Sequence, residues 1–275
     1  MTPERWYQAY FFDIDGTLCL GDTVLPGVIE TIQLLREKKR VIRFLSNESS
    51  SDREGHVRRL KKLGIDCDSE EVLTTIEATS AWIAERYPDA KVYPMGAPDL
   101  TKNLEKNRIQ VTEDPAEIDI VIASCDQHFS YPKLAKAFDA FYTYKRAILI
   151  ATNPDRHGPN GPNTATPDTG FVIAALEQSA GIECQMVMGK PNPTMLTAEL
   201  AKLGISPSDA LMVGDTFETD IQVAHNAGTD SAVTLTGDST LEDVVAAGPQ
   251  IRPTWVVENL SQLIPAAVDR MPLPS

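Results

Sequence analysis

The sequence predicts an α/β protein: a Rossmann-like, doubly wound parallel-sheet core into which a second α/β domain is inserted. Three observations lead to this prediction. Short apolar runs typical of buried strands alternate with amphipathic helical segments along almost the whole chain. Successive strand–helix units favour parallel strands joined by right-handed crossovers. The length of 275 residues exceeds that of a common single domain.

The N-terminal part of the chain contains two strand–helix units. The apolar run AYFFDI predicts a buried strand, and the helix that follows it begins just after Pro26, a residue favoured at helix starts. Gly64 marks the end of the second helix. The expected elements are strands at 9–14 and 41–45 and helices at 27–39 and 51–63.

A second series of elements begins near residue 76. We expect helices at 78–86, 100–106 and 132–144 and strands at 91–93, 118–123 and 147–151. The segment 153–170 then interrupts the pattern, because it holds four prolines and three asparagines and predicts no regular structure. A stretch of this length inside a compact region is usually functional or disordered.

A third series completes the chain. We expect strands at 185–188, 210–213, 231–235 and 254–256, helices at 171–180, 193–203 and 218–226, and a short last element at 259–264. Asn192 is the expected N-cap of helix 193–203, with Pro193 in its first position. The Pro-rich tail 271–275 is expected to fray.

The composition excludes several classes of protein. With 42% hydrophobic residues the chain is not a disordered one, and 25 basic against 39 acidic residues (25 − 39 = −14) argue against a nucleic-acid partner. No apolar run is long enough to span a membrane, and we expect no signal peptide at residues 1–10, which carry charge and lack an apolar run. Four scattered cysteines fit neither a disulfide framework nor a zinc site, so a cytoplasmic location is expected: Cys19, Cys67, Cys125 and Cys184.

The sharpest motif is Asp13-Ile14-Asp15-Gly16-Thr17, which follows the first expected strand. In open parallel sheets, ligands bind beyond the carboxyl ends of the strands. Strand alternation places both aspartates on one side, and two carboxylates this close repel each other unless a cation lies between them or one is protonated. Taken alone, the motif is also compatible with an acidic turn formed for backbone reasons.

Three other expected strands also end in polar residues. They are followed by Ser46-Asn47, by Lys190 in Gly-Lys-Pro, and by Gly214-Asp215 with Asp220 five positions further. Each is, by itself, an ordinary turn, cap or solvated lysine. Four such strand ends in one chain predict a functional site at the carboxyl edge of the sheet.

With these residues the sequence resembles the haloacid dehalogenase superfamily of phosphohydrolases. The four motifs of that superfamily match, in order, Asp13 to Thr17, then Ser46, then Lys190, then Gly214 with Asp215 and Asp220. Within it, the chain is similar to the NagD-like phosphatases through Ser46-Asn47, Gly-Lys-Pro and the segment Ala-Thr-Asn-x-Asp at 151–155. The resemblance covers nearly the whole chain. It implies a core of residues 1–76 and 186–275 and an inserted α/β cap domain of residues 77–185.

The resemblance implies a phosphoric monoester hydrolase that depends on Mg²⁺. Asp13 would be the nucleophile that forms an aspartyl-phosphate, and Asp15 the general acid and base. Ser46 and the backbone amides after Asp13 would hold the phosphoryl oxygens, and Lys190 would neutralise their charge. The expected catalytic residues are therefore Asp13, Asp15, Ser46 and Lys190.

The resemblance also implies a set of metal ligands. Asp13 and Asp215 would ligate Mg²⁺ through carboxylate oxygens and Asp15 through its backbone carbonyl, while Asp220 would hold metal-bound water or Lys190. The expected substrate-binding residues are Gly16, Thr17, Ser46, Asn47 and Lys190, joined from the 153–170 segment by Asn153, Asp155, Arg156 and His157. Asn160 and Asn163 are further candidates for hydrogen bonds to sugar hydroxyls.

The expected partner is a small phosphorylated metabolite, a sugar phosphate first, because the 153–170 segment is polar and short of aromatic residues. Nucleotides, phosphoglycolate, glycerol phosphate and pyridoxal phosphate are the alternatives within the subfamily. The resemblance makes a homodimer formed through the cap possible. The alternative outside the enzymes is a receiver-like phospho-acceptor module, which would need only about 120 residues and no acid at Asp15.

Overall fold

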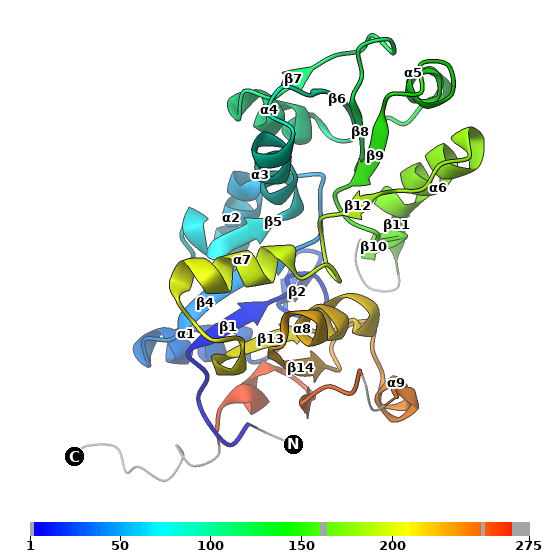
Figure 1. Ribbon diagram of the computed structural model, residues 1–275. Helices are drawn as coiled ribbons and strands as arrows, with labels where there is room; N and C mark the ends of the chain where they lie inside the picture. The colour runs from blue at the N-terminus through cyan, green and yellow to red at the C-terminus, as the bar shows by residue number, and fades with distance from the viewer. Residues whose placement is uncertain (1–2, 160–163, 249–250, 266–275) are drawn as a thin grey trace, which may run out of the picture. The chain divides into compact units, whose positions relative to one another are not determined.

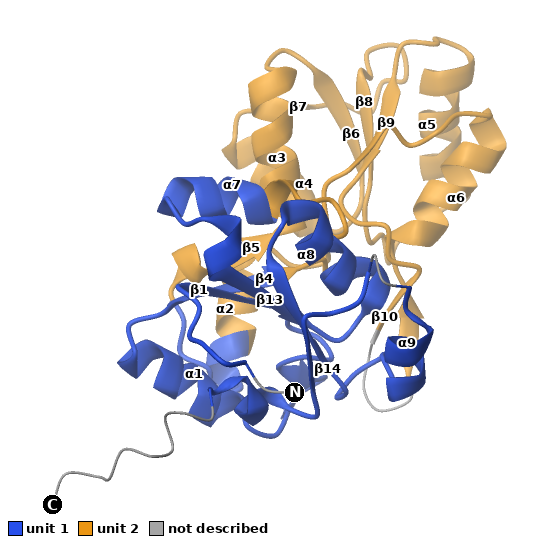
Figure 2. Ribbon diagram, turned by 60° about the horizontal axis from the view of Figure 1, so that its bottom comes forward, with its two compact units in different colours: residues 1–45, 60–67, 196–275 blue, residues 46–59, 68–195 orange. Residues whose placement is uncertain are grey.

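The chain folds, in a computed structural model, into two compact units, and residues 3–159, 164–248 and 251–265 are described. Unit 1 comprises residues 1–45, 60–67 and 196–275, and unit 2 comprises residues 46–59 and 68–195 (Figure 2). The predicted domain boundaries differ from this division and stay a prediction. Asn160, Asn163 and the tail 271–275 lie outside the described residues.

Unit 1 is built on parallel strands that lie in the order β15-β14-β13-β1-β4 within a six-stranded sheet (Figure 1). Strand β1 is buried along its whole length, as a strand of a parallel sheet with both faces covered must be. Its neighbours on either side are β13 and β4. The bounds are β1 Ala9–Phe12, β4 Val41–Ser46, β13 Ala210–Gly214, β14 Asp230–Thr234 and β15 Trp255–Val257. The predicted α/β class with a parallel core sheet is confirmed.

The other elements of unit 1 are short and connect or flank these strands. Strands β2 Cys19–Leu20 and β3 Thr23–Val24 form a hairpin directly after the first motif. The rest are α1 Val28–Glu37, the 3₁₀ turns η2 Pro207–Asp209 and η4 Leu260–Leu263, the π-helix η3 Phe217–Ile221, α8 Gln222–Ala227 and α9 Leu241–Ala246. The single helix expected at 218–226 is thus a π-helical turn that continues into an α-helix.

Two helices contain residues of both units. They are α2 Arg53–Lys62 and α7 Thr194–Leu203. At the start of α7, Oδ1 of Asn192 accepts the backbone N–H of Thr194 at 3.0 Å, which agrees with its predicted capping role.

Unit 2 contains a second parallel sheet, with strand order β12-β9-β8-β6-β7. Its strands are β6 Lys91–Met95, β7 Gln110–Val111, β8 Ile120–Ala123, β9 Ile148–Ala151 and β12 Met186–Val187. Its helices are α3 Thr75–Arg86, α4 Pro98–Lys106, α5 Tyr131–Tyr142 and α6 Thr169–Ala180, and η1 Ser69–Glu71 and β5 Val72–Thr74 precede α3.

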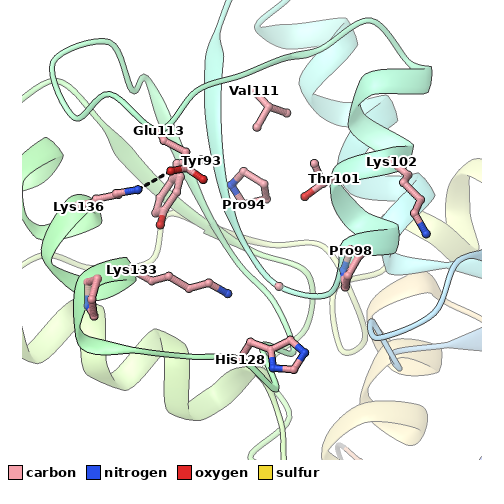
Figure 3. A pocket seen from close by; sticks show the side chains of 12 residues that line it. Tyr93, Pro94, Pro98, Thr101, Lys102, Val111, Glu113, His128, Lys133 and Lys136 are labelled. Carbon is pink, nitrogen blue, oxygen red and sulfur yellow. Dashed lines mark hydrogen bonds and ion pairs between the residues drawn. The ribbon is translucent and has the colours of Figure 1, made fainter.

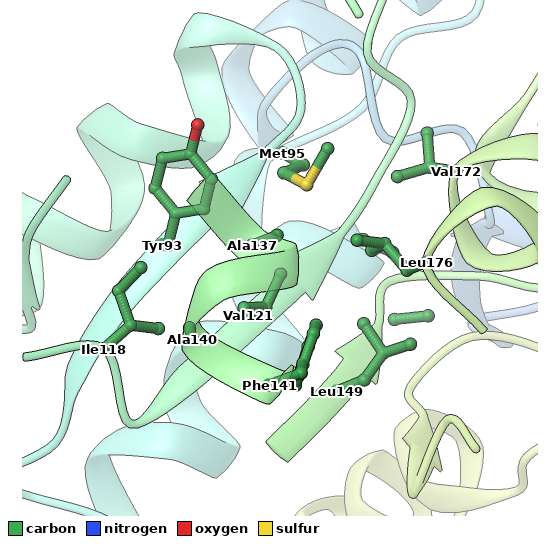
Figure 4. Packing of buried hydrophobic residues seen from close by; sticks show 12 residues of the cluster. Tyr93, Met95, Ile118, Val121, Ala137, Ala140, Phe141, Leu149, Val172 and Leu176 are labelled. Carbon is green, nitrogen blue, oxygen red and sulfur yellow. The ribbon is translucent and has the colours of Figure 1, made fainter. Parts of the chain in front are cut away.

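Both faces of the unit 2 sheet are covered by helices, which explains the unbroken apolar run at 120–123. Val121 belongs to the cluster that α5 and α6 form on one face (Figure 4). Ile120 and Ile122 belong to the cluster that α3 and α4 form on the other. Burial of each such side chain contributes about 1.5–3 kcal/mol. Among the described residues, no helix is long and apolar enough to cross a membrane.

The segment 153–170 contains regular structure, so the prediction that it holds none was wrong. Strands β10 His157–Pro159 and β11 Ala165–Pro167 pair antiparallel, with His157 opposite Pro167. In a two-stranded ribbon each strand has one unpaired edge, where a proline without an N–H costs no ladder hydrogen bond. A high proline content therefore argues against a central strand of a sheet, but it does not exclude a short two-stranded hairpin.

Candidate active site

Three buried aspartates of unit 1 form a carboxylate cluster. Asp13, Asp215 and Asp220 each offer an oxygen, and these oxygens lie within 4.8 Å of one another. Asp13 follows β1 and Asp215 follows β13, two strands that pair with Phe12 opposite Val213. The N–H of Asp13 donates to the carbonyl of Val213 at 2.8 Å. Adjacent parallel strands thus carry these residues to the same edge of the sheet, as predicted.

The first motif also shapes the surroundings of Asp215. The hydroxyl of Thr17 donates to Oδ1 of Asp215 at 3.2 Å. Gly16 has φ +89°, and a Cβ at this position would lie 2.3 Å from Oδ2 of Asp215. Glycine is needed here both for its backbone conformation and for the close approach of the carboxylate. The predicted substrate contacts of Gly16 and Thr17 stay a prediction, and the structure adds that both residues position Asp215.

The carboxylate of Asp220 is directed by the π-helix η3. Its Oδ2 accepts the backbone N–H groups of Asp215 at 3.2 Å and of Thr216 at 3.1 Å. Single π-helical turns within helices occur frequently at functional sites. These two hydrogen bonds take both lone pairs of Oδ2, which favours a positioning role for Asp220 over ligation through that oxygen.

Sequence reasoning missed one strand end of unit 1. Gly237-Asp238 follows β14 closely, and the backbone N–H of Asp238 donates to Oδ2 of Asp215 at 2.9 Å. A Cβ on Gly237 would lie 2.0 Å from that same oxygen. The sequence signal that could have predicted this strand end is the Gly237-Asp238 pair, which repeats the Gly214-Asp215 pattern found after the neighbouring strand.

The cluster fits a hard divalent cation. Three buried carboxylates repel one another strongly, and a cation among them removes that cost. Mg²⁺ and Ca²⁺ both prefer oxygen ligands. Asp15 is only partly buried, and its side chain is not among the three clustered carboxylates. Its predicted contribution is a backbone carbonyl, which stays a prediction.

A second group of predicted residues lies in unit 2 around Lys190, which is 2% exposed. Oδ1 of Asn47 accepts the backbone N–H of Lys190 at 2.8 Å, and Nδ2 of Asn47 donates to the Lys190 carbonyl at 3.0 Å. Nδ2 also donates to Asp155 at 3.0 Å. The nearby Ser46 hydroxyl accepts the N–H of Glu48 at 3.1 Å. The Asn47 side chain therefore fixes the backbone of Lys190, and its substrate contact stays a prediction.

Asn153 is fully buried, and its side chain makes several hydrogen bonds within the same group of residues. Its Nδ2 donates to Oδ2 of Asp155 at 2.9 Å, so both Asn47 and Asn153 hold that carboxylate. Its Oδ1 accepts three hydroxyl groups, those of Thr152 at 2.8 Å, Thr169 at 2.5 Å and Ser49 at 3.2 Å. Thr152 belongs to the Ala-Thr-Asn-x-Asp segment, whereas Ser49 and Thr169 carry no distinctive sequence signal. Arg156 and His157, by contrast, have exposed side chains.

Two of the cysteines, Cys125 and Cys184, are poor nucleophiles in their environment. All four are free thiols. Burial, with further contributions from Asp168 and Glu48, raises the pKa of Cys125 to about 12, and burial raises the pKa of Cys184 to about 11. Nucleophilic attack requires a thiolate, so phosphoryl transfer to Cys125 or Cys184 is not expected at neutral pH.

Replacement of Asn47 by Ala is expected to lower the free energy of unfolding by about 2 kcal/mol. The change leaves the buried N–H and carbonyl of Lys190 without their partner, and such groups are costly to leave unpaired. The melting temperature should fall by about 5 °C in a thermal unfolding experiment. Gln178→Ala, which removes an exposed amide in the same unit, is the matched control. Equal melting temperatures for the two variants would contradict the assigned role of Asn47.

Fold and cluster together define a class of protein: a parallel α/β protein with a carboxylate site suited to a divalent cation at the strand ends. Two family models match the chain, that of haloacid dehalogenase-like hydrolases over residues 10–110 and the HAD-hydrolase-like model over residues 187–263. An acid sugar phosphatase of Staphylococcus aureus is 33% identical over 260 residues, 94% of this chain and 98% of that protein. The chain belongs to the haloacid dehalogenase-like hydrolases.

Solved structures agree with this assignment. The 4-nitrophenylphosphatase of Thermotoga maritima has a TM-score of 0.86 and 33% identity, covering 94% of this chain and 96% of that one. NagD from Escherichia coli K-12 has a TM-score of 0.83 and 26% identity, with coverages of 94% and 98%. A glycerol phosphate phosphatase of Mycobacterium tuberculosis, described in complex with magnesium, has a TM-score of 0.85 and 27% identity, with coverages of 94% and 76%. The predicted NagD-like family and the class of phosphoric monoester hydrolases are confirmed.

Proposed function

We propose that this protein is a Mg²⁺-dependent phosphatase of small phosphate monoesters, sugar phosphates first, that acts through an aspartyl-phosphate on Asp13. The observation that carries the proposal is the buried cluster of Asp13, Asp215 and Asp220 at the carboxyl ends of β1 and β13. The relative that is an acid sugar phosphatase supports the substrate class, and the magnesium complex of the glycerol phosphate phosphatase supports the metal. A homodimer through the cap stays a prediction.

Two displacements at phosphorus make up the proposed reaction. An oxygen of Asp13 attacks the phosphorus atom in line, and the bond to the leaving-group oxygen breaks while Asp15 donates a proton to that oxygen. Asp15, now a carboxylate, then takes a proton from water, which attacks the phosphorus and releases inorganic phosphate from Asp13. Lys190 and Ser46 would bind phosphoryl oxygens during both steps. When bound, the cation held by Asp13 and Asp215 supplies charge neutralisation for the phosphoryl oxygens.

The positions of these residues suit the roles. Asp215 is held by Thr17 and by the N–H of Asp238, so a ligand oxygen is already oriented. Asp15 lies outside the three-carboxylate cluster and is partly buried, as a group that must exchange protons with substrate and water requires.

The test is a panel of phosphate monoesters assayed with purified protein. Phosphate release from p-nitrophenyl phosphate and from sugar phosphates is expected in the presence of Mg²⁺, with the highest kcat/KM for a sugar phosphate. The panel also contains nucleoside monophosphates, phosphoglycolate, glycerol phosphate and pyridoxal phosphate, which decide among the alternatives. Dialysis against EDTA should lower every rate at least about 100-fold, because metal-assisted charge stabilisation contributes several kcal/mol, and added Mg²⁺ should restore it. Full activity after dialysis would reject the metal, and no release from any ester would reject the proposal.

A further inference from the structure

Unit 2 contains a cavity of about 500 Å³ that is lined by none of the predicted catalytic or metal-binding residues (Figure 3). Cavities of 300–1,000 Å³ are of the size that small-molecule ligands occupy. Strand β6, helices α4 and α5 and the exit of β7 form its walls. The cavity therefore belongs to unit 2 alone.

The cavity lies where the topology of the unit 2 sheet favours a crevice. From β6 the chain passes through α4 to the edge strand β7, whereas from β8 it passes through α5 to β9 on the opposite side. The loops that leave these two neighbouring strands thus diverge. Gly96 and His128, which follow β6 and β8, both line the cavity. Ligands of open α/β sheets bind at such switch points, beyond the carboxyl ends of the strands.

The lining is rich in ammonium groups although the chain carries a net charge of −14. Lys102, Lys133 and Lys136 line the cavity, and Glu113 is the acidic residue among the lining residues. The four lining side chains sum to 3 − 1 = +2, and with Asp99 and Asp126, the partners of Lys102 and Lys133 outside the lining, the group sums to 3 − 3 = 0. The lining therefore offers ammonium N–H donors without a net positive charge, and a small anion would bind by sharing these donors with the carboxylates.

Lys133 is held in position by a buried carboxylate. Its ammonium group contacts both carboxylate oxygens of Asp126, at 2.8 and 2.7 Å, and the Asp126 side chain is 1% exposed. Figure 3 shows the Lys133 side chain extending from α5 in the direction of Pro98 at the start of α4. Because the partner is buried, the cation is fixed at the cavity instead of moving freely in solvent.

The other two lysines stand at more exposed positions. Lys102 pairs with Asp99 at 2.8 Å, and Lys136 pairs with Glu113, as the dashed line in Figure 3 shows. An ammonium group has three N–H donors, so one carboxylate partner does not exhaust its capacity. Pairs as exposed as these contribute little to stability and can rearrange around an incoming anion.

The rest of the lining is apolar or donates hydrogen bonds. Pro94, Val111 and Pro132 supply apolar surface, and Tyr93 supplies a ring that is 4% exposed. Burial, together with the charges of Glu113 and Asp126, raises the pKa of Tyr93 to about 12, so its hydroxyl stays protonated and able to donate. A ligand with a planar or apolar body and an anionic group matches both parts of this lining.

From the cavity, its place in the sheet and its three lysines, we infer that unit 2 carries a separate binding site for a small phosphorylated molecule with a planar, apolar body, of the nucleotide kind. This cap anion site, defined by Tyr93, Thr101, Lys102, His128, Lys133 and Lys136, is independent of the proposed catalytic residues. Its occupant is bound and not hydrolysed there, since the lining holds no carboxylate cluster of the kind that Asp13 belongs to.

The experiment is a calorimetric titration of the full-length, Mg²⁺-loaded protein with adenosine 5′-(α,β-methylene)diphosphate, whose terminal phosphorus is bound through carbon and is not a phosphate ester. One molecule is expected to bind per chain. The double variant Lys102→Ala/Lys136→Ala should raise the Kd at least about tenfold, which corresponds to about 1.4 kcal/mol. It keeps the buried Lys133–Asp126 pair and should fold. Thr101→Trp, which fills the cavity without a change of charge, should abolish binding.

Lys106→Ala is the matched control, because this lysine is exposed at the end of the same helix α4 and does not line the cavity. It should leave the Kd unchanged within roughly twofold. All three variants should hydrolyse p-nitrophenyl phosphate as the wild type does, which shows that they are folded. No binding to the wild type, an unchanged Kd in the double variant or in Thr101→Trp, or an equal loss in Lys106→Ala would overturn the inference. Binding of the nucleotide analogue and hydrolysis of p-nitrophenyl phosphate are measured in separate experiments. A negative result for the binding site therefore does not affect the test of the proposed phosphatase activity, and the reverse also holds.

Discussion

The Asp13→Asn variant is expected to lose hydrolysis of p-nitrophenyl phosphate by roughly 10⁴-fold or more while it stays folded. An amide has the shape of the carboxylate but is a far weaker nucleophile, so the bond from Asp13 to phosphorus cannot form. The same change removes one of the three clustered carboxylates. Initial rates with saturating p-nitrophenyl phosphate and Mg²⁺ measure the effect.

The melting temperature of the Asp13→Asn variant gives a second readout. Without a cation the three buried carboxylates repel one another, so loss of one charge should raise the stability of the EDTA-treated protein. Asp22→Asn is the control, because Asp22 is an exposed residue of the β2–β3 hairpin in the same unit and pairs with exposed Lys62. Its rate should equal that of the wild type. Wild-type activity in Asp13→Asn would remove Asp13 from the mechanism.

The parts of the site that sequence could predict are those that depend on the ends of buried parallel strands. The run before Asp13 is apolar because β1 is covered on both faces, and the change to polar residues marks where the strand leaves the sheet. The same change precedes Asp215 after β13. Pairing of β1 with β13 brings the two carboxylates together, and this pairing is seen in the fold, since the sequence placed each residue at a strand end without naming the neighbour of that strand.

Contacts made through shared polar groups could not be predicted in this way. An asparagine amide can hold backbone or substrate equally well, and only the fold shows that Asn47 is bonded to the backbone of Lys190. The π-helical turn η3 has no periodicity of its own that a sequence of five residues could show. Residues 46–59 and 68–76 were predicted to belong to the core but lie in unit 2. Their assignment depends on long-range packing, which local sequence patterns do not report.

The Asp15→Asn variant is expected to accumulate the phosphoenzyme, because loss of a general acid and base slows each proton transfer by roughly 10²–10⁴-fold. The two steps are affected unequally with p-nitrophenyl phosphate. Its phenolate leaves without much help from an acid, whereas the attacking water still needs a base. A burst of one p-nitrophenolate per chain should therefore precede a slow steady state, and intact-mass measurement after an acid quench should show one added phosphoryl group.

A sugar phosphate separates the two roles of Asp15 further. Its leaving group is an alkoxide that requires protonation, so the first step should slow as well and no phosphoenzyme should accumulate from this substrate in Asp15→Asn. The double variant Asp13→Asn/Asp15→Asn is the matched control and should show neither burst nor added mass with either ester. Because Asp15 is outside the carboxylate cluster, its replacement should leave stabilisation by Mg²⁺ intact. A steady rate without a burst, and without covalent phosphate, would show that Asp15 does not serve the hydrolysis of an aspartyl-phosphate.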